Sequence, residues 1–236
     1  MINLFSLVEN NPAFSRRLIR AARFHKRNLQ KKVRYGAKAP LAGELIYVPT
    51  RKIKFYDKSR GRRSCSGKIT PRDWAPQYMS LRSFPKIQFC WQHWHDGIPW
   101  EETGAYERMM KRIAVKGSMD GCRTFDDVVA RYNALDRVYE TVKRDGCLRS
   151  QKELRSQKRE DGGILIHIDR FGEPVFGLAG CHRMSMALVL DLAYIPAQIG
   201  FVHPDGVQHL YKYRQKPELP TPLFREKPIN QAIKLT

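Results

Sequence analysis

Hydrophobic and polar positions follow two patterns along the chain, one typical of strands and one typical of helices. The chain changes from one pattern to the other more than once. Residues 44–48 and 52–56 are short β-prone runs, the first of them closed by a proline. From about residue 78 to residue 160 apolar positions recur every three or four residues, which predicts helices. Residues 163–178 return to strand-like runs around a turn, which predicts a β-hairpin. This order predicts an α/β fold with a small mixed sheet and a helical insert at about 78–160.

After the hairpin the pattern changes from strand to helix at a glycine. Apolar positions from Met184 onward have helical spacing, and residues 195–202 form one more β-prone run. Four prolines follow Lys216, so residues 207–236 are predicted to form an irregular tail. We therefore expect three parts in the chain: a basic N-terminal arm at 1–40, an α/β domain at 41–206, and the tail.

Start and stop signals divide the insert into helices. Thr124 is followed by acidic residues in the first turn, which is typical of an N-cap, and Gly146 is a typical end signal. Residues 101–103 (Glu-Glu-Thr) are expected to cap an earlier helix. Residues 149–162 are polar throughout, so we expect a connector or an exposed turn of helix there.

Positive charge is concentrated at one end of the chain. The formal net charge is +20, and residues 1–72 hold 19 Lys and Arg against three acids. Residues 16–38 contain ten basic residues and no acid, with apolar residues at helical spacing, which predicts a basic amphipathic helix. The apolar positions are Phe14, Leu18, Ala22, His25 and Leu29.

Three roles for residues 14–38 are open at this point. The helix can pack its apolar stripe on the body, follow the phosphates of a nucleic acid, or lie on an anionic membrane. The basic side chains that would contact a nucleic acid or a membrane are Arg16, Arg17, Arg20, Arg23, Lys26, Arg27, Lys31 and Lys32.

Cysteine usage and hydropathy indicate a reducing compartment. The five cysteines are scattered without a Cys-x-x-Cys pair, which predicts neither a disulfide framework nor a zinc ribbon. Residues 90–96 contain one cysteine and two histidines, and we interpret them as an aromatic core segment rather than a metal site. Without a long apolar run or a secretory signal, we expect a cytoplasmic protein.

Phe55 and Tyr56 beside Lys54 could stack nucleic-acid bases or simply pack the core.

The glycine turn at Gly180 carries the candidate chemistry. A strand that turns sharply into a helix leaves backbone N–H groups free to bind phosphate. Arg183 could clamp phosphate oxygens, and His182 could donate a hydrogen bond or act as an acid or base. Cys181 is either a thiol activated by the helix dipole or a small apolar filler.

A second polar pair lies on the first strand of the hairpin. His167 and Asp169 are two residues apart, so the pattern places them on one face of the strand. They could present an acid/base pair to the nucleotide, or form a half-buried cross-strand polar pair.

Residues 163–203 resemble the ParB/sulfiredoxin superfamily. The likeness runs from the hairpin through Gly-Cys-His-Arg-x-x-x-Ala to Leu-x-x-Ile-Pro-Ala-Gln-Ile, and residues 44–53 resemble the first strand of that family. Its members place this turn on the phosphates of a bound nucleotide. Sulfiredoxins carry Gly-Cys-His-Arg itself, so the resemblance implies that Cys181 is the nucleophile and that His182 and Arg183 contact ATP.

The other branches of the superfamily match less well. ParB partition proteins have Gly-Glu-Arg-Arg in this turn and a helix-turn-helix domain after it, whereas here the tail follows, so we do not expect partition activity. The superfamily's small-molecule kinases carry Asp-Gly-His-His-Arg, and Ala179 stands where their Asp would be. The layout as a whole looks like a further branch of ParB-like microbial proteins.

The expected function follows from this turn. Gly180, Cys181, His182 and Arg183 would bind ATP or CTP with Mg, and Cys181, His182 and Asp169 are the candidate catalytic residues of a phosphotransferase, a hydrolase or a sulfiredoxin-like thiol enzyme. The alternative is a binding protein without catalysis, which would hold nucleic acid or an anionic membrane through its basic arm.

Overall fold

A computed structural model describes residues 22, 25–26, 28–58, 63–71, 78–155 and 159–218. Its fold is mixed α/β, which confirms the predicted fold class. Six strands of the described residues form one sheet in the order β1-β6-β4-β5-β2-β3. The strands are β1 (Leu45–Pro49), β2 (Phe55–Asp57), β3 (Tyr78–Ser80), β4 (Ile164–Ile168), β5 (Pro174–Phe176) and β6 (Tyr194–Val202).

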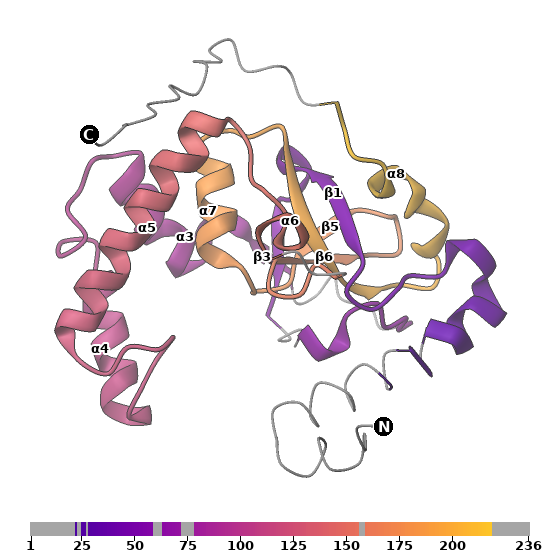
Figure 1. The fold of residues 1–236 in the computed structure, drawn as a ribbon, viewed down its shortest axis with the longest axis horizontal. Helices are drawn as coiled ribbons and strands as arrows, with labels where there is room; N and C mark the ends of the chain where they lie inside the picture. Colours follow the sequence, from indigo (N-terminus) through magenta and orange to yellow (C-terminus); the bar gives the residue numbers. More distant parts are fainter. Residues whose placement is uncertain are drawn as a thin grey trace, which may run out of the picture.

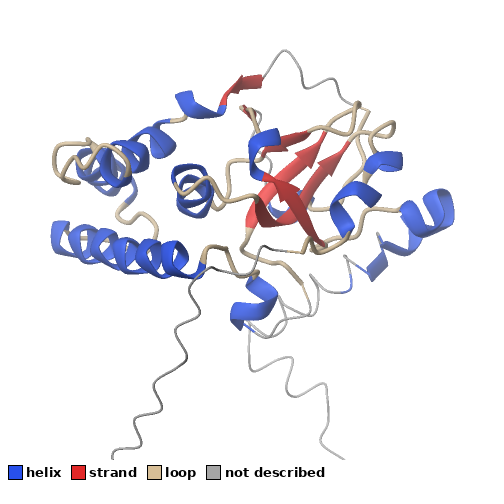
Figure 2. Ribbon diagram, turned by 90° about the horizontal axis from the view of Figure 1, so that it is seen from above, coloured by secondary structure: helices blue, strands red, loops and turns tan. Residues whose placement is uncertain are grey.

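The sheet contains both kinds of pairing. β4 and β5 form the predicted antiparallel hairpin, and β1 runs antiparallel to β6. β4 lies parallel to β6, and β5 lies parallel to β2. All five residues of β4 are buried, as expected for a central strand covered on both faces. Figure 2 shows this arrangement, with the strands between helices on either side.

Helices cover both faces of the sheet. Figure 1 shows α7 on one side, with α3, α4 and α5 beyond it, and α8 on the other side. The α-helices are α3 (Pro85–Trp94), α4 (Ala105–Lys116), α5 (Phe125–Asp145), α6 (Gln151–Arg155), α7 (Cys181–Val189) and α8 (Tyr211–Arg214). The short 3-10 helices are η1 (Gly36–Lys38), η2 (Thr50–Lys52), η3 (Arg63–Cys65), η5 (Leu81–Ser83) and η6 (Val207–His209). Residues 28–35 are also helical. No helix among the described residues is both long and apolar enough to cross a membrane.

The longest described helix, α5, begins and ends where the sequence predicts. The hydroxyl of Thr124 accepts the Asp127 N–H at 3.1 Å, and the Asp127 carboxylate accepts the Thr124 N–H at 3.0 Å. This reciprocal capping box satisfies two amide groups at the helix start. Gly146, with φ +63°, ends the helix in the left-handed conformation.

The preceding helix, α4, begins later than expected. Residues 100–103 form a turn, Gly104 (φ +80°) is the N-cap, and the helix starts at Ala105. The Thr103 hydroxyl accepts the Ala105 N–H at 3.2 Å, so Thr103 does bond to the helix start. Glu101 and Glu102 lie in the turn before the helix.

The predicted irregular tail is wrong for its first part. Residues 207–214 form η6 and α8, and Val207, Leu210 and Tyr213 join the main hydrophobic core. Tyr213 is 1% exposed, and its hydroxyl donates to the Gly172 carbonyl at 2.7 Å. The three apolar residues recur every third position, which is helical spacing, whereas the prolines that favour an irregular tail all lie beyond residue 216. Residues 219–236 lie outside the described part.

The polar connector before the hairpin is also more buried than expected. Glu160 is fully buried, and its carboxylate accepts the N–H groups of Gln151 at 2.8 Å and Lys152 at 3.1 Å. These bonds cap the first turn of α6, where acceptors of backbone N–H groups are needed. A polar sequence here therefore encodes a buried cap rather than an exposed loop.

Two hydrophobic clusters share helices α3 and α5. The larger one combines the sheet with α7, and the smaller one fills the space between α3, α4 and α5. Trp94 and Leu135 pack against both clusters. Residues 90–94 lie on α3, where Cys90 is buried and Trp94 stacks on Tyr139, so this part of the segment belongs to the aromatic core, whereas His95 and Asp96 are exposed.

Candidate phosphate site at the start of helix α7

The turn from the hairpin into α7 requires glycine. Gly180 has φ +77°, and a Cβ atom there would lie 2.8 Å from the Ile164 Cα. Leu178 also has a positive φ, of +58°, which is strained for a residue with a branched side chain. The Leu165 N–H donates to the Ala179 carbonyl at 3.0 Å and holds this turn against β4. The backbone of the turn is therefore closely packed and strained.

The first turn of α7 carries the features of an anion site. Its N-cap makes no side-chain hydrogen bond to the first amides, and the turn contains no acidic residue. Burial lowers the pKa of His182, and the charges of Lys86 and Arg131 lower it further. Burial raises the pKa of Cys181, and the charges of Lys86 and Arg63 oppose that rise, so all three cations act on this turn. The N–H groups of the helix start, the positive end of the helix dipole and the charges of these cations favour a bound anion. Arg63 is itself held by the protein, since its guanidinium donates to the Gly163 carbonyl at 2.6 Å and to the Gln198 side chain at 3.3 Å.

One carboxylate balances part of this charge. Asp120 forms ion pairs with Lys86 at 3.2 Å and Arg131 at 3.9 Å, and its carbonyl accepts a second bond from Arg131 at 3.1 Å. Burial opposes ionisation of Asp120, but the two cations outweigh it and lower its pKa. Two cations therefore share one carboxylate, which leaves positive charge for a ligand.

His182 is a neutral side chain at neutral pH. Burial, assisted by Lys86 and Arg131, lowers its pKa to about 4. Its ring meets the Tyr132 ring edge-on, with the centroids 6.0 Å apart. His182 is thus suited to hydrogen bonding in the uncharged form, and a pKa this low departs from the acid/base role near pH 7 considered from the sequence.

Cys181 does not have the character of an activated thiol. Burial raises its pKa despite the cations nearby, and its sulfur donates to the Leu178 carbonyl at 3.6 Å. Of the two interpretations open from the sequence, the activated thiol is not supported, because desolvation outweighs the local charges. This environment favours the alternative interpretation, a small side chain that fills the space beside the turn.

Arg183 is engaged by the protein itself. Its guanidinium donates to the Arg149 carbonyl, and its Nε is buried without a hydrogen-bond partner among the described residues. Burial lowers the pKa of Arg183, and the nearby Glu160 opposes that change. Arg183 thus ties α7 to the loop before α6, a role that the predicted phosphate clamp did not include.

Asp169 lies away from the other candidate catalytic residues. It follows the end of β4 whereas Gly180 contacts Ile164 at its start, and five residues of strand span about 16 Å. Its carboxylate accepts the N–H groups of Phe171 at 2.9 Å and Glu173 at 2.8 Å, which closes the hairpin turn. The prediction that Asp169 joins Cys181 and His182 in one site is therefore wrong.

His167 is a core residue. It is fully buried, its Nδ1 accepts the Phe201 N–H at 2.9 Å, and burial lowers its pKa to about 4. Asp169 lies in the hairpin turn, and the His167 ring is buried beside β6. These two residues therefore do not present an acid/base pair to the first turn of α7.

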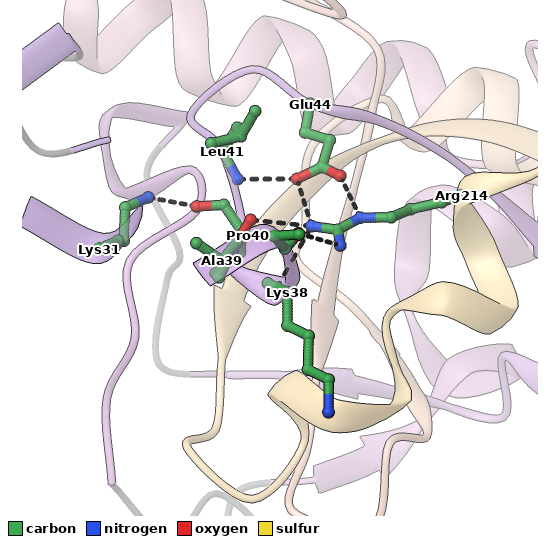
Figure 3. Close-up of polar contacts among 8 residues, drawn as sticks. Lys31, Lys38, Ala39, Pro40, Leu41, Glu44 and Arg214 are labelled. Atoms are coloured by element: carbon green, nitrogen blue, oxygen red, sulfur yellow. Dashed lines mark hydrogen bonds and ion pairs between the residues drawn. The ribbon is translucent and has the colours of Figure 1, made fainter. Parts of the chain in front are cut away.

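The described part of the basic arm turns its apolar stripe outward. Ala22, His25 and Leu29 are exposed, Leu29 to 60%, so packing of this stripe on the body is not observed for them. Instead Lys31 donates to the carbonyls of Pro40 and Gly67, the former drawn in Figure 3. Lys26 and Lys32 are exposed. The remaining predicted contact residues lie outside the described part: Arg16, Arg17, Arg20, Arg23 and Arg27.

Sequence reasoning missed the charged residues that surround the α7 turn. Lys86, Asp120 and Arg131 come from the insert, and Arg63 precedes the described strand β3 by more than ten residues. No local signal marks them, because only the packing of α3 and α5 beside α7 brings them together. Among the described residues, no group of three or more His, Cys, Asp or Glu side chains could hold a metal ion.

Comparisons with known proteins identify no relative, so the function is argued from the residues of this chain. Searches for a matching family model, a matching curated protein and a matching solved structure each found none.

Proposed function

We propose that the first turn of α7 binds the polyphosphate of a nucleoside triphosphate, ATP or CTP, with Mg. The observation that carries the proposal is that the charges of Lys86, Arg131 and Arg63 act on a helix start that has neither a side-chain cap nor an acidic residue, with Lys86 and Arg131 joined through Asp120. Three separate segments supply these cations, and each is placed by the fold. A polyphosphate is the common ligand that needs this much positive charge beside backbone N–H groups.

Each part of the site has a distinct role in this proposal. The backbone amides of the first turn bind phosphate oxygens, while Lys86 and Arg131 neutralise their charge. Magnesium in nucleotide sites is usually held by one or two carboxylates together with phosphate oxygens, and Asp120, whose charge acts on Cys181 and His182, would take this role. His182, neutral at pH 7, offers one further hydrogen bond.

Phosphoryl transfer or hydrolysis fits the site better than thiol chemistry. A thiol enzyme needs Cys181 as thiolate, and burial works against that form. Phosphoryl transfer depends mainly on positioning and on charge stabilisation, which the cations supply. We therefore expect Cys181→Ser to keep any nucleotide turnover, measured as phosphate release, and complete loss of turnover would restore the thiol route.

Thermal shift with ATP, CTP and GTP in the presence of Mg tests the binding site. A ligand at one hundred times its Kd stabilises the native state by about 2.7 kcal/mol, which raises Tm by several degrees. The double variant Lys86→Gln/Arg131→Gln should lose the shift. Lys111→Gln, which removes an exposed cation of α4, is the matched control and should keep it. Absence of a shift for every nucleotide, or an equal shift in the double variant, would contradict the proposal.

The second candidate function is peripheral binding to an anionic membrane through the basic helix. Leu29 and Val33 lie one turn apart and are 60% and 84% exposed, beside the exposed Lys32. A helix with apolar side chains flanked by cations is typical of the membrane interface. Sedimentation with phosphatidylserine vesicles should be lost in Leu29→Asp/Val33→Asp. It should persist in Val115→Asp, a control at an equally exposed apolar residue of α4.

A further inference from the structure

A second, independent surface at the opposite end of α7 combines cations with an exposed aromatic ring. A cavity of about 420 Å³ lies where η2, the segment after β3 and the end of α7 meet. Its lining includes Arg51, Lys54, Ser80, Arg82 and Asp191. This volume suits a phosphate group with part of its sugar.

The charge of this cavity is positive. Asp191 is the acidic residue in its wall, and it is already paired with Arg51, whose Nε donates to it at 3.1 Å. Lys54 has no ion-pair partner among the described residues, and the Arg82 guanidinium lies 4.4 Å from the centroid of the Trp91 ring. Arg82 and Lys54 are both exposed. An anion in the cavity would therefore meet two cations that no carboxylate of the described chain neutralises.

An aromatic platform adjoins the cavity. Phe55 of β2 is the cross-strand partner of Ser80, and residues paired in this way have Cβ atoms about 5 Å apart. Phe55 is 45% exposed and stacks on Tyr78, with ring centroids 5.9 Å apart and an interplanar angle of 17°. The neighbouring Tyr56 is buried in the core. Tyr56 is thus a core residue, whereas the Phe55 ring presents a face to solvent.

We propose that the surface made by the cavity and the Phe55 ring binds single-stranded nucleic acid. One backbone phosphate occupies the cavity beside Lys54 and Arg82, and the adjoining base stacks on Phe55. Cationic grooves beside exposed aromatic rings are how single strands are bound without reading their sequence. A duplex keeps its bases stacked inside and cannot use the ring. Thr50, also in the wall, has a buried hydroxyl without a partner among the described residues, a further unused donor.

The test compares three probes by fluorescence anisotropy: a thymidine decamer, an abasic decamer with the same phosphates, and a ten-base-pair duplex. Phe55→Ala should weaken binding of the thymidine decamer about tenfold and leave the abasic strand unchanged, because only the base uses the ring. Phe171→Ala, at a 72% exposed phenylalanine of the hairpin turn, is the matched control and should change neither. In Phe55→Trp, the thymidine decamer should quench the new indole fluorescence.

The charges are tested separately. Lys54→Ala/Arg82→Ala should weaken both decamers and reduce the slope of log affinity against log salt by about one unit. Equal affinity for the thymidine and abasic strands, equal effects of Phe55→Ala and Phe171→Ala, or tighter binding of the duplex would overturn the proposal. Loss of nucleotide binding in Lys86→Gln/Arg131→Gln would leave it untouched, since that site lies at the other end of α7.

Discussion

Arg214 and Glu44, 170 residues apart in the chain, form a partly buried ion pair in which the Arg214 Nε donates to the Glu44 carboxylate at 2.7 Å. Figure 3 shows the guanidinium lying between this carboxylate and the backbone that leads to it. Arg214 also donates to the carbonyls of Ala37 at 3.0 Å and Ala39 at 2.8 Å. Helix α8 therefore fastens the segment between the basic helix and β1.

Arg214→Ala should lower the free energy of unfolding by about 2 kcal/mol, because hydrogen bonds to charged groups are each worth about 1.5–3 kcal/mol. Urea unfolding followed by circular dichroism measures the loss. Lys212→Ala removes an exposed cation from the same helix and should change stability by less than about 0.5 kcal/mol. Equal stability of the two variants would show that the ion pair contributes nothing.

Gly180→Ala should be markedly more destabilising than Gly117→Ala. Both glycines have φ near +75°, so both substitutions carry the cost of left-handed backbone, about 1 kcal/mol. Only at Gly180 would the new Cβ meet backbone, 2.8 Å from the Ile164 Cα, whereas nothing lies within 4 Å at Gly117. The close approach should add about 1–3 kcal/mol, measured by thermal unfolding. Similar losses in the two variants would mean that the turn relaxes freely.

Stability should fall steeply as the pH drops from about 6.5 to about 4. The unfolded chain protonates His167 and His182 near their ordinary pKa of about 6.5, whereas in the folded chain burial lowers both pKa values to about 4. The unfolded state therefore binds more protons in this window, which favours unfolding. The fully buried His167 accounts for up to about 3 kcal/mol, and the partly exposed His182 for less.

Urea unfolding at a series of pH values measures this dependence. His182→Gln should make the decline between pH 6.5 and pH 4 shallower. His95→Gln, at an exposed histidine of the same protein, should leave it as in the wild type. A wild-type stability that stays constant across this window would contradict the burial of the two imidazoles.

Asp136→Ala should loosen the insert. The carboxylate accepts the indole N–H groups of Trp94 at 2.8 Å and Trp100 at 3.0 Å. Removing it leaves two largely buried donors without their acceptor, which should cost about 3 kcal/mol. Tryptophan fluorescence should shift to longer wavelength as water reaches the indoles. Glu140→Ala, one turn further along the exposed side of α5, should affect neither stability nor emission.

Local signals in the sequence predicted local structure well. The hairpin at 163–178, the cap at Thr124 and the helix end at Gly146 depend on a few neighbouring residues, and the structure confirms them. The spacing of Val207 and Leu210 is an equally local signal for a helix, whereas the prolines that favour an irregular tail begin only after residue 216. The burial of Glu160 could not be predicted from its polar surroundings, because it depends on where α6 is placed.

At the candidate site, too, local features could be predicted from the sequence, and features that depend on tertiary packing could not. Gly180 was identified because a glycine between a strand and a helix is visible in the sequence. Asp169 was misplaced because alternation along a strand gives the face but not the end at which a side chain lies. Lys86 and Arg131 were missed because their meeting at α7 is set by helix packing across about a hundred residues.

Trp94 and Leu135 pack against both hydrophobic clusters, so the two clusters share these side chains as part of their boundary. Excising residues 78–160 would strip apolar surface from the sheet and α7 as well as remove the insert. The insert is therefore an integral part of the protein rather than a detachable module, and a shortened chain without it would need new side chains at the cut surface. Heating should accordingly melt both clusters in one step.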